Sequence, residues 1–218
     1  MAAKKRKIDA DNPAPDLIDY AASLLSRGEV IVCPTDTGYA LTANALDPKA
    51  VLRIFRMKGR VYANPIHVAV HSIKAAERYA YLNQAAEILA RRFLPGALTM
   101  VLPKKDVIPS MLVSGKETVG IRIPDNKIIL ELAAITDMPL TATSANLSGQ
   151  PTPYSAGEAM AQLSASTRNI ALVLDQGEIS QKGLSTIVDL TVEPAQLIRQ
   201  GVLSWLDIRQ ILRSETNE

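Results

Sequence analysis

Apolar and polar positions recur along the chain with two different periods, which predict helices and strands in turn. In residues 16–26, Leu17, Ala21 and Leu24 recur at helical spacing, and Gly28 follows at the position of a C-terminal cap. Short apolar runs between turn residues predict strands. The predicted helices cover residues 16–26, 48–57, 84–93, 127–135, 155–163 and 205–212, with another helix beginning after Ser72. The predicted strands cover residues 30–33, 39–42, 66–70, 98–102, 119–123, 140–143, 171–174, 186–190 and 196–199.

The order of these elements indicates the fold class. Helices and strands are interspersed, but some strands follow one another directly. We therefore expect an α+β (mixed α/β) fold, with a mixed sheet and helices packed on it rather than a strictly parallel βαβ arrangement. A single domain is expected over residues 16–212, because this stretch has no internal repeat and no low-complexity linker. Residues 104–116 are predicted to form a surface loop.

Residues 1–15 are predicted to form a flexible basic N-terminal tail. Residues 4–7 read Lys-Lys-Arg-Lys, and Pro13 and Pro15 follow. A solvated tail is the simpler interpretation, and an RNA-contacting arm or a localisation signal is the alternative.

Composition narrows the class of protein. Hydrophobic residues make up 47% of the 218 residues and aromatic residues only 4%, so the core must consist mostly of Leu, Ile, Val and Ala. The net charge of +2 argues against a bulk electrostatic nucleic-acid binder but leaves room for a local basic groove. Cys33, the single cysteine, excludes an intramolecular disulfide and suits a reducing compartment, so we expect a cytoplasmic protein. No apolar run approaches about 18 residues, so no membrane span is expected.

The segment 139–149 has the pattern of a ligand-binding loop. It begins as an apolar strand and continues into Ser144, Asn146 and Ser148, which offer hydroxyls and an amide with little bulk. A Ser/Asn-rich turn without function is the alternative for this segment alone. The ligand-binding interpretation gains weight beside residues 58–60, Lys-Gly-Arg, which supply fixed positive charge for an anion.

Basic residues stand at several strand or helix ends, where they could converge on one site. They are Lys58, Arg60, Arg122 and Arg199. Arginine matches phosphate or carboxylate oxygens bidentately and lysine acts as a compact charge, so the expected ligand is an anion with several oxygens, such as a nucleoside triphosphate. The hydroxyls of Thr37, Ser144 and Ser185 suit a small polar substrate. Taken singly, each of these residues could equally be a helix-end charge, a surface arginine or a turn hydroxyl.

Other standard catalytic patterns are missing from the sequence. There is no Gly-rich phosphate loop ending in Gly-Lys-Ser/Thr, no GxGxxG after a strand and no GxSxG elbow. Cys33 lies within an apolar run and is expected in the core. His67 and His71 lie in or at the end of a strand pattern, so structural or surface roles are the default for both.

Over about residues 16–205 the chain resembles the YrdC/TsaC-type family, the threonylcarbamoyl-AMP synthases. The matching segments occur in the same order along the chain and together form a specific signal. They are residues 34–39 (Pro-Thr-Asp-Thr-Gly-Tyr), 58–60 (Lys-Gly-Arg) with 64–65 (Asn-Pro), 95–99 (Pro-Gly-Ala-Leu-Thr), 119–124 (Val-Gly-Ile-Arg-Ile-Pro), 144–149 (Ser-Ala-Asn-Leu-Ser-Gly), 185–189 (Ser-Thr-Ile-Val-Asp) and 198–201 (Ile-Arg-Gln-Gly).

This resemblance implies a three-layer YrdC-like fold, in which a twisted mixed β-sheet flanked by helices forms a large concave cationic cavity. It implies a nucleotidyltransferase that condenses L-threonine, bicarbonate and ATP, with Mg²⁺, to threonylcarbamoyl-AMP and pyrophosphate. A partner protein, a tRNA threonylcarbamoyl transferase, would then modify N6 of adenosine 37 in tRNA. The chain could also contact tRNA or double-stranded RNA, and no membrane contact is implied.

The resemblance also implies roles for single residues, position by position. The functional Lys/Arg/Ser/Asn set of the family falls on Lys58, Arg60, Ser144 and Asn146. The nucleotide-contacting positions are Arg60, Asn64, Thr118, Ser144, Thr152 and Arg199. The threonine-contacting positions are Thr37, Arg122, Ala142 (through its backbone) and Ser185. No protein metal ligand is implied.

The chain departs from the family pattern at a few positions. Ala69 stands where many members have a threonine-contacting histidine, and His67, two residues earlier, would be displaced by roughly 6–7 Å along the strand. Residues 35–41 are also similar to the YciO-like branch of the family. Two alternatives follow: a YciO-like RNA-binding protein without synthase activity, or a related enzyme that adenylates another carbamate or acyl group.

Overall fold

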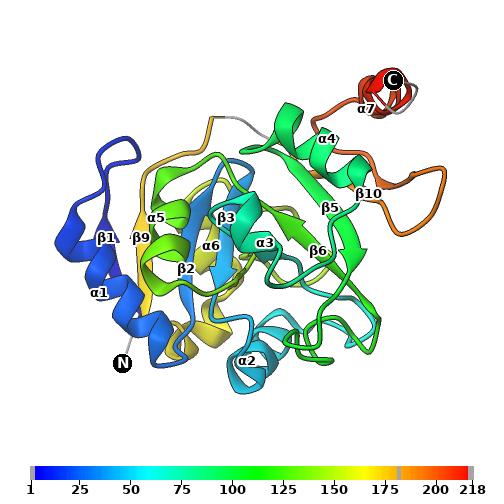
Figure 1. Ribbon diagram of the computed structural model, residues 1–218. Helices are drawn as coiled ribbons and strands as arrows, with labels where there is room; N and C mark the ends of the chain where they lie inside the picture. The colour runs from blue at the N-terminus through cyan, green and yellow to red at the C-terminus, as the bar shows by residue number, and fades with distance from the viewer. Residues whose placement is uncertain (1–2, 181–182, 216–218) are drawn as a thin grey trace.

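The computed structural model describes residues 3–180 and 183–215, which fold into two mixed β-sheets with helices packed around them (Figure 1). The helices are α1 (Pro15–Ser26), α2 (Pro48–Lys58), α3 (Ile73–Ala76), α4 (Gln84–Phe93), α5 (Lys127–Thr136), α6 (Ala156–Gln162) and α7 (Trp205–Glu215), with a 3-10 helix, η1 (Ser164–Asn169). In the described residues, every helix is too short or too polar to cross a membrane. The predicted mixed α/β class is confirmed.

The first sheet has five strands and is covered on one face by α1 and α5. Its strand order is β1 (Lys4–Lys7), β9 (Leu172–Asp175), β2 (Ile31–Thr35), β3 (Gly38–Thr42) and β8 (Thr143–Ser144). Successive side chains of β2 point to opposite faces. Ile31 and Cys33 therefore pack with Ile18 and Leu132 under the two helices, while Val32 enters the larger core on the other face.

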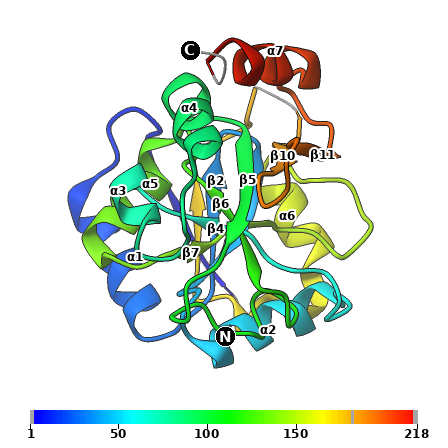
Figure 2. The same cartoon turned by 45° about the vertical axis from the view of Figure 1, so that its right-hand side comes forward.

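The second sheet has six strands, in the order β11 (Gln196–Arg199), β10 (Thr186–Asp189), β5 (Leu98–Pro103), β6 (Thr118–Arg122), β4 (Val68–Ala69) and β7 (Leu140–Thr141). The helices α4 and α7 pack together at one end of the molecule and α2 lies at the opposite end (Figure 2). One twisted sheet was expected, and the structure has two. The chain passes from one sheet to the other at Ala142, because β7 pairs with β4 and β8 pairs with β3.

Local capping explains why the predicted helix starts are close to the observed ones. Each of five helices begins after a residue whose side-chain oxygen accepts a hydrogen bond from a backbone N–H in the first turn. These capping residues are Asp47, Ser72, Asn83, Asn126 and Ser155. At the other end of α2, Gly59 adopts a left-handed conformation with φ of 56°, which ends the helix and turns the chain before Arg60.

One prediction about a non-regular segment is wrong and another is confirmed only in part. Residues 4–7 were expected in a flexible tail, but they form β1, which pairs in parallel with β9, and Lys5 forms an ion pair of 2.8 Å with Asp175. Four consecutive basic residues have no apolar alternation, so only pairing with a distant strand could reveal this element. Residues 104–116 form a loop that is largely at the surface, as expected, but Ile108, Leu112 and Val113 are buried in the larger core.

Candidate active site

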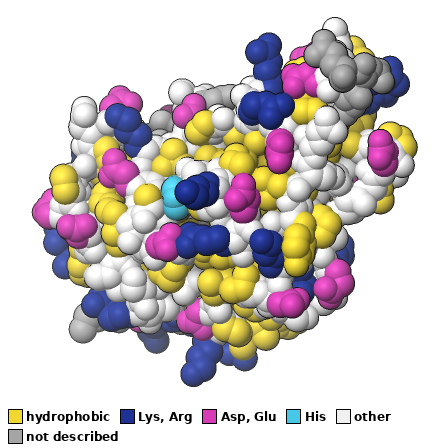
Figure 3. Space-filling model, in the orientation of Figure 1, with side chains coloured by type: hydrophobic (Ala, Val, Ile, Leu, Met, Phe, Trp, Pro, Cys, Tyr) yellow, Lys and Arg dark blue, Asp and Glu magenta, His cyan; other side chains and the backbone are white. Residues whose placement is uncertain are grey.

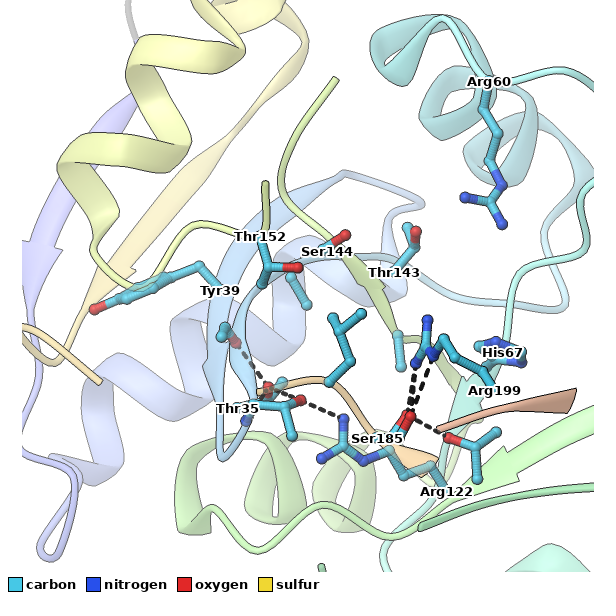
Figure 4. A pocket seen from close by; sticks show the side chains of 16 residues that line it. Thr35, Tyr39, Arg60, His67, Arg122, Thr143, Ser144, Thr152, Ser185 and Arg199 are labelled. Carbon is cyan, nitrogen blue, oxygen red and sulfur yellow. Dashed lines mark hydrogen bonds between the residues drawn. The ribbon is translucent and has the colours of Figure 1, made fainter. Parts of the chain in front are cut away.

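A cavity of about 100 Å³ lies where the two sheets meet, and most of the predicted site residues line it (Figure 4). The predicted residues in its wall are Thr37, Arg60, Arg122, Ala142, Ser144, Thr152, Ser185 and Arg199. They come from strand ends and loops of both sheets, which explains why residues distant in sequence converge. Lys58, Asn64, Thr118 and Asn146 are not in the wall.

The turn between β2 and β3 presents two side chains to Arg122, the last residue of β6. Arg122 donates from Nη2 to Asp36 at 2.6 Å and from Nη1 to the Thr37 hydroxyl at 2.6 Å. Its Nε donates to the Gly96 carbonyl at 3.3 Å. The Arg122 and Asp36 side chains are only 7% and 9% exposed, so the pair is buried. A guanidinium has five N–H groups, so Arg122 keeps two for a ligand while its charge is balanced.

The turn itself depends on tight local contacts. The Thr35 hydroxyl donates to the Gly38 carbonyl at 2.7 Å and accepts from the Thr37 amide at 3.2 Å. Gly38 has a φ of +135°, and a methyl group there would overlap the side chain of Thr152. Glycine at this position therefore allows the loop carrying Thr152 to close over the turn.

Arg199, the last residue of β11, is held by Ser185 just before β10. Its Nε and Nη2 donate to the Ser185 carbonyl at 3.2 and 2.9 Å, and Nη2 also reaches the Ser185 hydroxyl at 3.1 Å. That hydroxyl lies 2.9 Å from the hydroxyl of Thr99. Thr99 lines the cavity, and the sequence had not singled out its side chain as a site residue. The Nη1 group of Arg199 makes no hydrogen bond to any described residue.

Arg60 points into the cavity from the loop after α2 (Figure 4). Its Nε and Nη2 donate to the carbonyls of Asn64 and Pro65 at 3.0 and 2.9 Å. Asn64, predicted to contact nucleotide, thus uses its backbone to hold Arg60 while the residue lies outside the wall. Neither Arg60 nor Arg199 forms an ion pair with a carboxylate of a described residue.

The charge of these two arginines is uncompensated and partly desolvated. Burial lowers the pKa of Arg60, and burial together with Arg122 and Arg60 lowers the pKa of Arg199. A lowered arginine pKa means that the surroundings disfavour the cation, which remains charged because its ordinary pKa is so high. An anionic ligand would relieve this repulsion, so the cavity is suited to bind an anion.

Lys58 lies beneath the Ser/Asn loop rather than in the cavity wall. Its ammonium donates to the carbonyls of Ser144 and Asn146 and to Oδ1 of Asn146, the last two at 2.9 and 2.8 Å. The Ser144 hydroxyl donates to the same Asn146 Oδ1 at 2.6 Å. All three ammonium protons are therefore committed to the loop. Burial and the neighbouring Arg60 lower the pKa of Lys58 to about 7.

The structure also differs from the prediction at three further residues. Thr118, predicted to contact nucleotide, begins β6 and pairs with Pro103, at the opposite end of the strand from Arg122. It lies outside the wall, about 13 Å along the strand from Arg122 at 3.3 Å per residue. His67, for which a structural or surface role was the default, lines the cavity. Asp36, part of the quoted segment 34–39, was not singled out as a site residue.

The arrangement offers fixed positive charge, hydroxyls and N–H donors, without a nucleophile–base pair. Cys33 is buried in the core, and burial raises the pKa of its thiol. Among the described residues there is also no group of three His, Cys, Asp or Glu side chains that could hold a metal ion. The site can therefore bind and orient an anion and a small polar molecule and stabilise charge between them.

Comparison with known proteins gives a consistent result. The family model Sua5_yciO_yrdC, described as "Telomere recombination", matches residues 23–201. The chain is 39% identical over 196 residues to the threonylcarbamoyl-AMP synthase of Pyrococcus abyssi, covering 89% of this chain but only 57% of that relative's length. The structure is similar to that of P. abyssi Sua5 complexed with L-threonine, with a TM-score of 0.90 and 37% identity over 95% of this chain and 60% of the other. It is also similar to E. coli YciO, with a TM-score of 0.83 and 28% identity over 93% and 97% of the two chains.

Proposed function

The chain belongs to the Sua5/YciO/YrdC family, and from this premise we propose that it is an L-threonylcarbamoyladenylate synthase. The reaction condenses L-threonine, bicarbonate and ATP to threonylcarbamoyl-AMP and pyrophosphate. The observation that carries the proposal is the pair Arg60 and Arg199, whose charges face one cavity without a carboxylate partner among the described residues. Two such guanidiniums suit the phosphates of ATP.

The amino acid would bind on the side of the cavity formed by Arg122. The two N–H groups of Arg122 that have no protein partner among the described residues could bind the carboxylate of an amino acid. Because Asp36 balances the charge of Arg122, this side of the cavity suits a zwitterionic ligand rather than a polyphosphate. Thr37, Ala142 and Ser185 line the same cavity and supply further polar groups. The similar P. abyssi structure was solved with L-threonine, which supports this assignment.

The chemistry needs no protein nucleophile. The threonine amine takes up bicarbonate as a carbamate with loss of water, and a carbamate oxygen then attacks the α-phosphorus of ATP. The bond between the α-phosphorus and the bridging oxygen breaks, and pyrophosphate leaves. Arg60 and Arg199 would stabilise the charge that develops on the phosphates, and Ser144 would orient the nucleotide from a loop that Lys58 and Asn146 hold in place.

Mg²⁺ would enter with ATP, held by phosphate oxygens. The cationic wall fits this arrangement, because its described residues include no carboxylate and the neighbouring Asp36 is already bound to Arg122. A partner protein that transfers the threonylcarbamoyl group, contact with tRNA or double-stranded RNA, and a cytoplasmic location belong to the same proposal and rest on the family.

The test is direct. The purified protein is incubated with ATP, Mg²⁺ and bicarbonate, with and without L-threonine, while pyrophosphate and threonylcarbamoyl-AMP are measured. Product that depends on both threonine and bicarbonate is expected. Arg60→Ala should lower this turnover at least a hundredfold without changing the melting temperature, since Arg60 bonds only to carbonyls of its own loop. Arg56→Ala, which changes an exposed arginine in the last turn of the preceding helix α2, is the matched control.

Other outcomes identify the alternatives. Normal turnover in Arg60→Ala would contradict the assignment of the site. ATP binding without product would favour a YciO-like role, for which the similarity to E. coli YciO is the supporting observation. Turnover with an acceptor other than threonine would favour the adenylation of another carbamate or acyl group.

A further inference from the structure

His67 is a cavity residue for which neither the family resemblance nor the proposed reaction provides a role. It lies directly before β4 and its side chain is part of the cavity wall (Figure 4). The imidazole packs over Gly120 of β6 so closely that a methyl group at Gly120 would overlap Nδ1. The Ala142 amide donates to the His67 carbonyl at 2.9 Å, which fixes the backbone. The ring is therefore held in one place by its surroundings.

The ring nitrogens of His67 are unused. No described residue forms a hydrogen bond with the imidazole, and its nitrogens are not among the fully buried side-chain atoms of the described chain that lack partners. They are therefore accessible from the cavity. A neutral imidazole has one N–H donor and one acceptor nitrogen, and both can be offered to a ligand.

The charges around His67 come from four segments of the chain. They are Arg199 at the end of β11, Arg60 in the loop after α2, and Arg122 at the end of β6 with its partner Asp36. Burial first, and then Arg199, Arg60 and Arg122 in that order, lower the pKa of His67 to about 3. The imidazole is therefore neutral at neutral pH. Of the three arginines, Arg199 has the largest effect on this pKa and the balanced Arg122 the smallest.

We propose that His67 contacts the phosphate groups of the nucleotide between Arg60 and Arg199. This rests on the proposed function, because it names a further residue of the same anion-binding region. In the ligand-free site a third cation would add to the repulsion, and a neutral imidazole avoids that cost while still providing an N–H donor. A bound polyphosphate reverses the local field, so it raises the affinity of His67 for a proton.

The chain has only two histidines, so NMR of the imidazole signals tests the idea on the unmodified protein. Inorganic pyrophosphate is added to the full chain at neutral pH, and His71, which is outside the cavity wall, serves as the internal reference. The His67 signals should shift on saturation while those of His71 do not. A subsequent titration should show the His67 midpoint at higher pH with pyrophosphate than without. Saturable pyrophosphate binding that leaves His67 unshifted would overturn the proposal.

Variants separate a phosphate contact from a contact with the amino acid. His67→Leu should weaken binding of an ATP analogue with a methylene group between the α- and β-phosphates about tenfold, the loss expected for one hydrogen bond to a charged group. Binding of L-threonine should stay unchanged. His67→Asn, which retains an N–H donor, should recover part of the loss, and His71→Asn should match the wild type. Weakened threonine binding with unchanged nucleotide binding would overturn the proposal.

These results are distinguishable from failure of the proposed function. Pyrophosphate binding that depends on His67, without formation of threonylcarbamoyl-AMP, would retain the phosphate contact and reject the synthase. Threonine-dependent product formation that is identical in His67→Leu and wild type, with equal KM for ATP, would retain the synthase and reject the contact. A protein that binds neither pyrophosphate nor the ATP analogue would contradict both.

Discussion

Replacing Lys58 by methionine tests whether this residue acts through the Ser/Asn loop or on the ligand itself. Lys58 is 2% exposed, and all three of its protons are donated to Ser144 and Asn146. Methionine has a similar length and no charge, so Lys58→Met removes the three hydrogen bonds with little change of volume. The loop should therefore lose its anchor while every residue of the cavity wall is retained.

The expected loss of stability follows from what the three acceptors retain. The Ser144 carbonyl still accepts from the Asn146 amide at 2.9 Å, and Asn146 Oδ1 still accepts from the Ser144 hydroxyl. Only the Asn146 carbonyl is left without a described partner. An unsatisfied buried acceptor costs about 1–3 kcal/mol, and the removal of a buried ammonium offsets part of the other losses. We therefore expect a loss of about 2–3 kcal/mol, or roughly 4–12 °C in melting temperature for a chain of this size.

Thermal unfolding and steady-state kinetics together check this prediction. Lys49→Met, an exposed lysine on the same helix, is the matched control and should leave both unchanged. In Lys58→Met the KM for ATP should rise several-fold more than the KM for threonine, because the displaced loop carries Ser144 and Asn146. A variant as stable as the control would refute the anchoring role. A stable variant with unchanged KM values and no turnover would instead indicate that Lys58 touches the reacting groups.

Other consequences can be measured on the same protein. Asp36→Asn should lower stability by about 1.5–3 kcal/mol in urea unfolding, because Arg122 loses its buried counter-charge, and sulfate should restore part of it. Gly201→Ala should melt several degrees lower, because a methyl group there would overlap the backbone of Leu184 and the next residues. Since the pKa of Lys58 is about 7 when folded and 10.5 ordinarily, the unfolded chain binds more protons between these values. The difference in free energy of unfolding between wild type and Lys58→Met should therefore increase from pH 7 to pH 9 and be smallest below pH 7.

The helices were predictable because their signals are local. The helix predicted over residues 84–93 has the same bounds as α4. The side chain of Asn83 caps this helix by accepting a hydrogen bond from the Ala86 amide. The predicted ends of short strands in the six-stranded sheet were less accurate. For example, β4 was predicted over residues 66–70 and is observed as Val68–Ala69. A helix is defined by neighbours along the chain, whereas the length of a strand depends on which distant strand it meets.

Pairing between distant segments explains the larger errors. β1 exists because residues 4–7 lie beside β9, more than 160 residues later in the chain. The segment 140–143 has one continuous pattern, yet it divides between two sheets at Ala142 because β4 and β3 offer separate edges. Neither partner can be read from the segment itself. The mixed class was therefore predictable, while the division into two sheets was not.

For the site, the sequence predicted which types of residue are present. It did not predict which of the charged side chains are paired within the protein and which face the cavity. Arg60, Arg122 and Arg199 do line one cavity, as the clustering of basic residues at strand ends suggested. Which arginine is balanced depends on Asp36, whose place in the β2–β3 turn aims it at β6. Lys58 carries the same charge as the arginines but turns into the loop. A sequence shows which charges are present, and only the fold shows which of them are already paired.

The location of the charge also favours a small anion over RNA as the ligand of the cavity. On the face shown in Figure 3, basic and acidic side chains are interspersed, and the net charge of the whole chain is only +2. Binding an RNA backbone requires several basic groups spread over an accessible surface, since each contact neutralises one phosphate. The uncompensated charges of Arg60 and Arg199 are instead directed into a cavity of about 100 Å³. Two arginine side chains that face one small cavity can contact the few phosphates of a compact ligand. A ligand such as a nucleotide therefore fits the site better than an extended RNA backbone.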